Sequence, residues 1–255
     1  AQWSDDLHHA LHALLTGEQQ GYYTDFGGAD GVAVLARTLT RVFRHAGDFS
    51  AFRGTDWGAP VDPDSPYYDG HSFVAFLQDH DQVGNRATGD RLGHLAGSGR
   101  AAIGAALLLT SPYTPMLFMG EEFDASTPWQ YFTDHSEEWL AESIREGRQA
   151  EFAEHGWSGE VPDPQDPGTV ETSTLEWAEL DQPQHAAMLS WYRTLIALRR
   201  RLPDVREAVL GEGAVARDGD LLLVRRGELN VVANLGDEPG RLPVALDAEV
   251  LAGFG

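Results

Sequence analysis

The segment Phe76–Arg86 holds the side chains with the clearest chemistry in this sequence. Carboxylate, imidazole, amide and guanidinium groups recognise sugars because they can bond adjacent hydroxyl groups in pairs. Glycoside hydrolysis also needs carboxylates beside the scissile bond, to protonate the leaving oxygen and stabilise an oxocarbenium-like state. The spacing alone leaves open a local alternative, in which Asp79 and Asp81 cap a turn and His80 packs nearby. The candidate site residues here are His80, Asp81, Gln82, Gly84, Asn85 and Arg86.

Two further groups of polar residues accompany predicted helices and strands. Asp5, Asp6, His8 and His9 lie at the start of a predicted helix, where the loops on the catalytic face of a barrel end, so we expect them to line a substrate. Glu121 and Glu122 follow a short apolar run. Glu121 is a candidate for the same cleft, and pairing of either Glu with an Arg is the alternative.

Metal sites are weaker interpretations of the same residues. Asp79, Asp81, Gly84 and Asp90 occupy four positions of a calcium-loop pattern, but Val83 stands where a ligand is needed and position 12 is not Glu. His8 and His12 have a zinc-compatible i, i+4 spacing, with no third ligand evident. We therefore expect no metal.

The elements that must position these residues alternate between helix and strand. Leu7, Ala10, Leu11, Leu14 and Leu15 give one helix a buried face, and a second helix is predicted over residues 31–44. Residues 48–70 are rich in Gly, Pro and Asp and predict a long loop. Apolar runs at 72–77 and 116–119 predict buried strands that end in charged residues, with a helix over 95–109 between them. This rhythm predicts parallel β/α units.

The last third of the chain changes character. Residues 123–180 are polar and predict an irregular excursion with one helix near 136–154, followed by a strong helix over 182–201 that Pro203 ends. Short apolar runs at 221–224, 230–233, 244–246 and 250–251 then predict a small antiparallel β-sandwich domain. We place the domain boundary at residues 203/204, with an incomplete all-β domain over 204–255.

Composition restricts the partners. The formal net charge is −22, which disfavours both nucleic acid and an anionic membrane surface and is compatible with a neutral sugar. Cys is absent, so no disulfide or thiolate site is expected. No apolar run approaches the roughly 18 residues of a membrane span. Because the sequence begins at Ala1 without an initiator Met or a signal peptide, it predicts a fragment of a cytoplasmic protein.

Several motifs resemble one family. Phe76, His80 and Asp81 match the Phe-x-x-x-His-Asp motif at the seventh barrel strand of the α-amylase superfamily. Segments 1–9, 16–18, 21–26, 78–86, 116–122 and 131–135 are similar to the maltooligosyltrehalose trehalohydrolases of that superfamily. Asp79 departs conservatively from the Asn expected before His80. The resemblance covers most of residues 1–200 and implies the second half of a (β/α)8 TIM barrel, strands 6 to 8, followed by the small β domain.

The resemblance also implies a reaction. The family hydrolyses the α-1,4 bond beside the terminal trehalose of maltooligosyltrehalose, with water, retaining anomeric configuration and using no cofactor. It uses an Asp nucleophile at strand four, a Glu acid/base at strand five and an Asp at strand seven. Only the last has a counterpart here, Asp81, which is expected to stabilise the transition state while His80 binds the same sugar. The other two carboxylates are expected upstream of residue 1, so residues 1–255 alone are expected to be inactive.

Two alternatives remain open from the sequence. A glycogen-branching or debranching enzyme belongs to the same superfamily, although the motif at residues 3–9 speaks against it. The second alternative is not an enzyme: the chain could be a non-catalytic carbohydrate-binding fragment, because two of the three expected carboxylates are missing from it. Oligosaccharide length preference and oligomeric state are not encoded in any recognisable pattern.

Overall fold

The computed structural model describes residues 1–154, 161–241 and 248–255. Its helices are α1 Asp5–Thr16, α2 Gly31–Arg41, α3 His80–Gly84, α4 Leu92–Ala96, α5 Ser98–Leu109, α6 Glu138–Glu154, α7 Pro167–Thr172, α8 Pro183–Arg201 and α9 Pro203–Arg206. Its strands are β1 Gln2–Trp3, β2 Ala46–Ser50, β3 Thr55–Gly58, β4 Phe73–Phe76, β5 Thr114–Met116, β6 Ala214–Asp218, β7 Leu221–Arg226 and β8 Leu229–Asn234. Short 3₁₀ helices η1 Gly21–Asp25, η2 Gly28–Asp30, η3 Gly70–Ser72, η4 Glu121–Phe123 and η5 Trp177–Asp181 complete the set.

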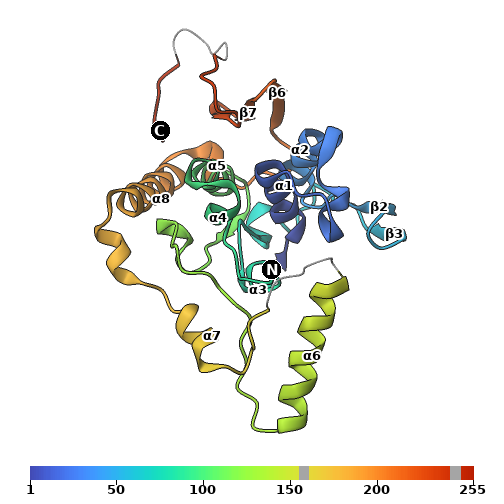
Figure 1. Ribbon diagram of the computed structural model, residues 1–255. Coiled ribbons are helices and arrows are strands. Elements are labelled where there is room, and N and C mark those ends of the chain that lie inside the picture. Colours follow the sequence, from blue (N-terminus) through green and yellow to red (C-terminus); the bar gives the residue numbers. More distant parts are fainter. Residues whose placement is uncertain (155–160, 242–247) are drawn as a thin grey trace.

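The strands β1, β4 and β5 form a parallel sheet with β4 in the middle. Helix α1 follows β1, α5 follows β4, and α8 follows β5 after a long excursion (Figure 1). Parallel strands that alternate with helices are the repeating unit of a (β/α) barrel, so the predicted partial barrel region is consistent with the structure. Within the described ranges β1 and β5 each pair with β4 alone, which leaves both outer strands with a free edge.

The helices bury one continuous apolar core against this sheet. Phe73, Ala75 and Leu77 alternate along β4 and its end, and they share a cluster with Leu7 and Leu11 of α1. Residues of α5 and α8, including Leu108, Met188, Tyr192 and Leu195, belong to the same cluster. Burial of these side chains stabilises the arrangement that holds the carboxyl ends of β1 and β4 side by side.

Some predicted boundaries were wrong for local reasons. Residues 48–70, predicted as a loop, contain most of the antiparallel hairpin β2–β3, because the paired strands are short and lie among Gly and Asp residues. The helix predicted over 95–109 is divided by Gly97, whose φ of 81° is unsuited to an α-helix. The second predicted barrel strand lies earlier, over Thr114–Met116, so residues 117–119 already belong to a loop.

Residues 123–180, predicted as an irregular excursion, lead from η4 to α8. The excursion carries α6, close to the predicted helix, and α7, and both lie at the lower side of the molecule in Figure 1. Its outgoing and returning segments are joined by the Gln165 side chain, which accepts from the Thr133 hydroxyl and from the His135 backbone N–H. Across the residues described, no helix is long and apolar enough to cross a membrane.

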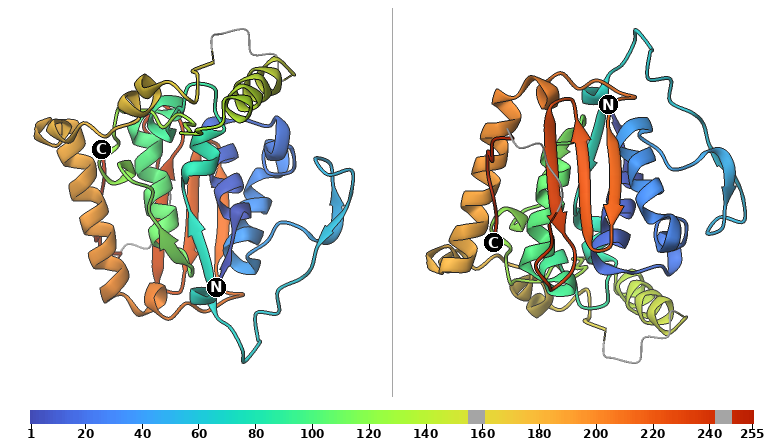
Figure 2. Two further views of the ribbon diagram at one scale, coloured as in Figure 1. Left: turned by 90° about the horizontal axis from the view of Figure 1, so that it is seen from below. Right: turned by 90° about the horizontal axis from the view of Figure 1, so that it is seen from above.

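The chain ends in one antiparallel sheet of order β6-β7-β8. Figure 2 shows this sheet lying beside α2 and α5, and Leu222, Ala233 and Leu235 join the same apolar cluster as the barrel-type core. The run 250–251, predicted as a strand, is not one, and the run 244–246 lies outside the described residues. The second sheet that a sandwich needs is therefore not seen in the described residues, and the boundary at 203/204 stays a prediction.

Candidate active site

The candidate site lies where β1 and β4 end. The parallel register pairs Gln2 with Phe73 and Trp3 with Val74, so both strands finish at the same edge of the sheet. Asp5 opens α1 shortly after β1, and the Asp79–Asp81 segment follows β4. This edge is where barrel enzymes place their catalytic groups, because the loops there converge over the strand ends.

Asp79 fixes the direction of the segment that follows β4. It is buried, and its Oδ1 accepts hydrogen bonds from the backbone N–H groups of Asp81 (2.9 Å) and Gln82 (3.1 Å), as an N-cap residue does. The Gln82 side-chain amide also lies against the Asp79 carboxylate, which it can reach as a donor. The local alternative, in which Asp79 and Asp81 cap a turn, therefore holds for Asp79, and His80 and Asp81 are exposed in the first turn of α3.

His80 and Asp81 are the accessible members of the segment. Their side chains are 61% and 65% exposed, and His80 Nε2 lies 3.3 Å from Asp81 Oδ1. Asp5 opens α1, and burial, followed by the negative charges of Asp79, Asp6 and Asp81, raises its pKa. A concentration of carboxylates of this kind favours a positively charged transition state and keeps a neighbouring carboxylic acid protonated.

Comparison with known proteins then decides the family. The chain is 49% identical over 244 residues to malto-oligosyltrehalose trehalohydrolase of Arthrobacter ramosus, and 46% identical over 254 residues to the same enzyme of Brevibacterium helvolum. These alignments cover 95% and 98% of the chain. The chain belongs to the malto-oligosyltrehalose trehalohydrolase family. No family model matches it.

The chain spans about two fifths of the length of these trehalohydrolases, 41% and 42% respectively. A solved protein from Salmonella typhimurium, assigned as an alpha amylase, superposes with a TM-score of 0.80 at 39% identity. That alignment covers 98% of this chain and 44% of the solved one. The resemblance to the α-amylase superfamily that the motifs indicated is therefore confirmed.

Asp6, His8 and His9 are more enclosed than the prediction of a substrate contact requires. His8 is buried; its Nδ1 donates to the Leu77 carbonyl (2.7 Å) and its Nε2 accepts from the Tyr23 hydroxyl (3.1 Å). Burial, followed by His9 and His12, lowers its pKa well below the usual range, so His8 is neutral. Its place inside the fold is that of an anchor between α1 and the end of β4, rather than a sugar ligand.

The His9 ring packs against the rings of Tyr22, Tyr23 and Phe26, and Asp6 is held by a hydrogen bond within the protein. Burial, then His12 and Arg53, lower the pKa of His9 to about 3. Asp6 Oδ2 accepts the backbone N–H of Arg44 at 2.6 Å, which ties α1 to the chain after α2. Of the four residues predicted at the start of α1, Asp5 is the one that the structure leaves exposed. A direct role in sugar binding for Asp6 and His9 stays a prediction.

Arg86 meets a partner that sequence reasoning missed. Its guanidinium donates two hydrogen bonds to the Glu18 carboxylate, at 3.0 and 2.8 Å, and Glu18 Oε2 also accepts from His12 Nε2 at 2.8 Å. The hydrogen bond from His12 lowers the pKa of Glu18 most, burial raises it, and Arg86 lowers it further. The resulting pKa of Glu18 is about 2. This two-point pair fixes the segment after α3 to the end of α1. Thr16-Gly17-Glu18 was noted as a motif, but spacing gave no sign of its partner 68 residues later.

The remaining candidates of this segment differ in exposure. Gly84 is buried, its carbonyl accepts from Arg148 Nη2 at 2.8 Å, and a Cβ there would lie 3.6 Å from the Trp129 ring. Asn85 is exposed beside it and Gln82 is half-buried. The structure therefore brings Asp5, His80, Asp81 and Asn85 to the surface as candidates for contact with a sugar.

The metal alternatives are no stronger in three dimensions. Asp79, His80 and Asp81 offer ligand atoms within 4.8 Å of one another, and they are the residues of this site that could approach a cation. The Asp79 carboxylate already serves as the helix cap, however. The zinc alternative loses its basis because both ring nitrogens of His8 are hydrogen-bonded and His12 bonds Glu18.

Glu121 is the prediction that the structure corrects most clearly. Since β5 ends at Met116 and Gly120 turns the chain with a φ of 87°, Glu121 begins η4 and its side chain is buried beneath α8. The Tyr192 hydroxyl lies 3.4 Å from Glu121 Oε1. Burial raises the pKa of Glu121 to about 8. A carboxylate enclosed in this way has no surface to offer a sugar.

The raised pKa of Glu121 predicts a change of stability with pH. Between the usual value near 4.5 and about 8, the unfolded chain releases a proton that the folded chain keeps, so stability should decline as pH rises. We expect Glu121→Gln to remove this decline, because the amide cannot ionise. Thermal unfolding midpoints of the wild type and the variant, taken at pH 5 and pH 9, measure this effect. The midpoint of the variant relative to that of the wild type should be higher at pH 9 than at pH 5. Parallel profiles for both proteins would contradict the expectation.

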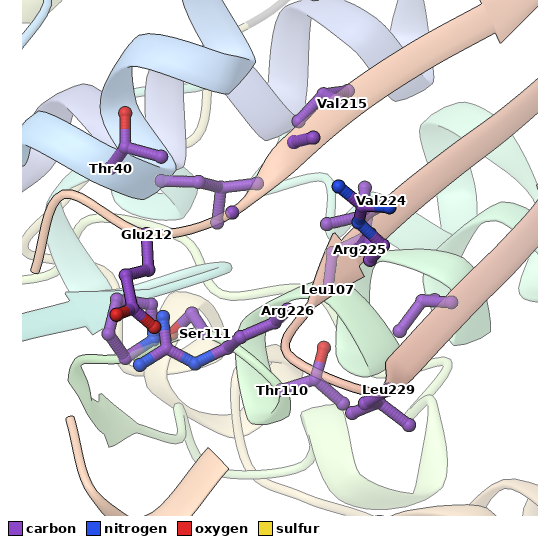
Figure 3. A pocket seen from close by; sticks show the side chains of 15 residues that line it. Thr40, Leu107, Thr110, Ser111, Glu212, Val215, Val224, Arg225, Arg226 and Leu229 are labelled. Atoms are coloured by element: carbon purple, nitrogen blue, oxygen red, sulfur yellow. The ribbon is translucent and has the colours of Figure 1, made fainter. Parts of the chain in front are cut away.

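Two pockets lie away from the strand ends. One, of about 20 Å³, lies between α2, α5 and the C-terminal sheet, where Figure 3 shows Thr40, Val215, Glu212 and Arg226 around it. The other, of about 400 Å³, lies beside β5 and α8 and is lined by His71, Leu109, Pro115, Leu117, Ile196, Arg199, Arg200 and Arg206. Neither lining includes the exposed candidates Asp5, His80, Asp81 or Asn85.

Proposed function

We propose that the protein carrying this chain hydrolyses maltooligosyltrehalose at the α-1,4 bond next to the trehalose unit, with retention, and releases trehalose. The single observation that carries the proposal is the 46–49% identity to enzymes named malto-oligosyltrehalose trehalohydrolase along nearly the whole chain. The geometry supports it, since an accessible carboxylate, Asp81, stands beside an accessible imidazole at the end of a parallel strand.

The role of each residue follows from what it can reach. Asp81 accepts hydrogen bonds from ring hydroxyls of the sugar at the cleavage point, and its negative charge stabilises the oxocarbenium-like transition state. His80 donates to the same sugar. Asp79 holds both through the first turn of α3, and Glu18 fixes the segment further along through Arg86. The nucleophile and the acid/base of a retaining hydrolase are supplied by residues outside this chain.

The proposal is tested by comparing two proteins on one substrate. A full-length protein that carries this chain should release trehalose from a maltooligosyltrehalose, measured by chromatography, and residues 1–255 alone should not. Trehalose released by residues 1–255 alone would refute the division of catalytic residues. Absence of trehalose release from the full-length protein, together with transfer or debranching of α-glucans, would assign a different activity of the superfamily.

A further inference from the structure

Arg91 is a buried cation that lies ten residues beyond Asp81 and has no part in the proposed reaction. Its side chain is 1% exposed, although the residue stands at the start of α4. Removing a guanidinium group from water costs free energy unless its N–H groups are bonded. Burial accordingly lowers the pKa of Arg91, and the charges of Glu121, Glu122 and Asp124 act in the opposite direction. The contacts of this side chain therefore reveal what its burial achieves.

The Arg91 guanidinium joins the two ends of the loop that follows β5, residues 117–127. Its Nε donates to the Thr127 carbonyl at 2.5 Å, and its Nη1 donates to the Met119 carbonyl at 2.8 Å. Between these carbonyls the chain turns sharply, since Gly120 has a φ of 87° and Asp124 a φ of 54°. A guanidinium group is planar and presents its N–H groups as a fixed fork, so one side chain sets the separation of both carbonyls.

Arg91 also lies at the end of the loop that follows β4, residues 78–92, which carries Asp81. The Leu92 N–H donates to Oε1 of the buried Gln78 at 2.8 Å, and this bond closes the loop at its base. Gln78 directly precedes Asp79, which caps the turn of His80 and Asp81. The closed base of the β4 loop is thus fastened to the β5 loop through the residue next to Leu92.

The sheet explains why these two loops can share one side chain. Strands β4 and β5 are parallel neighbours, with Phe76 opposite Met116, so both loops leave the same edge. The Trp129 N–H donates to the Gly89 carbonyl at 2.9 Å, which connects the β4 loop to the chain just after the β5 loop. The Asp81 side chain is 65% exposed and is not held by packing. Its place over the strand ends therefore depends on how its loop is fastened.

We propose that Arg91 and Gln78 are positioning residues that fix the β4 loop, and Asp81 with it, against the β5 loop. The proposal rests on the proposed function for its reaction. A shift of about 1 Å in a group that stabilises a transition state can lower the rate about a hundredfold. Lys keeps the charge of Arg91 but offers a single ammonium group on a flexible stem, which does not reproduce the fork.

The test is a double-mutant cycle on kcat in a full-length protein carrying this chain, with trehalose release as the signal. Arg91→Lys should lower kcat about tenfold and leave KM within about twofold, because the loss arises in the transition state. In the Asp81→Asn background the same substitution should lower kcat less than about twofold, since the carboxylate that it positions is already absent. Equal losses in both backgrounds, or no loss in the wild type, would overturn the proposal.

Arg199→Lys is the matched control. Arg199 Nη1 donates to the carbonyls of Leu109 and Ser111 at 2.9 and 2.7 Å, and its Nη2 donates to the Tyr113 carbonyl. This guanidinium also spans a turn of backbone, but that turn leads into β5, at the opposite end of the strand from Met119. Arg199→Lys should lower the unfolding midpoint as Arg91→Lys does, yet keep kcat within about twofold when both are assayed well below their midpoints. An equal loss of kcat in the control contradicts positioning by Arg91.

A second variant keeps the test decisive if Arg91→Lys does not fold. Gln78→Met has a side chain of similar length but no acceptor for the Leu92 N–H, so it opens the base of the β4 loop. It enters the same cycle with Asp81→Asn and carries the same expectation. A loss of kcat that is equal with and without the Asp81 carboxylate would count against positioning here as well.

Amide hydrogen exchange gives a readout that does not depend on the reaction. In Arg91→Lys, exchange should accelerate about tenfold in peptides spanning 79–92 and 117–129 and stay unchanged across 214–226, whereas Arg199→Lys should leave the first two unchanged. If no trehalose is released but exchange accelerates in those two peptides, the proposed function fails and the fastening by Arg91 is supported. If trehalose is released and neither kcat nor exchange responds to Arg91→Lys, the proposed function stands and the positioning role fails.

Discussion

Asp81→Asn is expected to lower trehalose release by a full-length protein carrying this chain about a thousandfold, with little change in fold. Asn keeps the size of the side chain but loses the charge that opposes the developing oxocarbenium ion, and such a loss costs several kcal/mol of transition-state stabilisation. Asp81 is exposed and is held by the Asp79 cap rather than by its own side chain, so stability should be nearly unaffected. Steady-state kinetics and thermal unfolding measure the two effects.

A matched control distinguishes the role of Asp81 from a general effect of charge. Asp218, exposed at the end of β6, belongs to the C-terminal sheet, and Asp218→Asn removes the same charge there. That variant should keep its activity within about twofold. Activity of Asp81→Asn within about tenfold of the wild type would sink the assignment of Asp81 as transition-state stabiliser, because tenfold corresponds to only about 1.4 kcal/mol.

The largest loss of stability is expected from Gly89→Ala. Gly89 has a φ of 72°, which costs any residue with a Cβ about 1–2 kcal/mol. A Cβ at this position would overlap the Trp129 carbonyl group and lie 2.7 Å from the Gln130 nitrogen. Since the Gly89 carbonyl also accepts the Trp129 N–H at 2.9 Å, the two backbones cannot separate without losing that bond. We expect a total loss of about 3 kcal/mol or more.

Chemical denaturation of the variants measures this loss, and the chain provides its own control. Gly99 lies in the first turn of α5, where an added Cβ would meet no atom within 4 Å, so Gly99→Ala should be neutral or stabilise by up to about 1 kcal/mol. Gly89→Ala should also lower activity, because the segment that continues from Asp81 would lose its contact with Trp129. Equal stability of the two alanine variants would contradict this prediction, because it would mean that the backbone at Trp129 shifts without cost to accommodate the added Cβ.

The sequence determined the features that depend on local pattern. The apolar spacing of α1 and α8 predicted both helices to within a few residues, and the short apolar run before Asp79 predicted β4. The order of strand, helix and strand predicted parallel pairing, because adjacent parallel strands are joined by a crossover connection, which is usually a helix. The motif around His80 and Asp81 indicated the family that the comparisons confirmed.

The tertiary structure decided which polar residues are available to a ligand. His8 and Asp5 start the same helix, yet the 100° rotation per residue turns His8 to the Leu77 carbonyl and leaves Asp5 outside. Glu121 and Asp81 each lie five residues beyond the end of a strand, yet Gly120 turns the chain before Glu121 and the Glu121 carboxylate is enclosed under α8.

Pairings between distant segments were equally beyond the sequence. Glu18 and Arg86 are 68 residues apart, and Arg91 reaches the carbonyl groups of Met119 and Thr127 because β4 and β5 are neighbours in the sheet. Periodicity reports which face of an element is apolar, since burial repeats with the geometry of the helix or strand. It carries no information about which polar groups meet across the fold, because those contacts depend on how the elements pack and where each one stops.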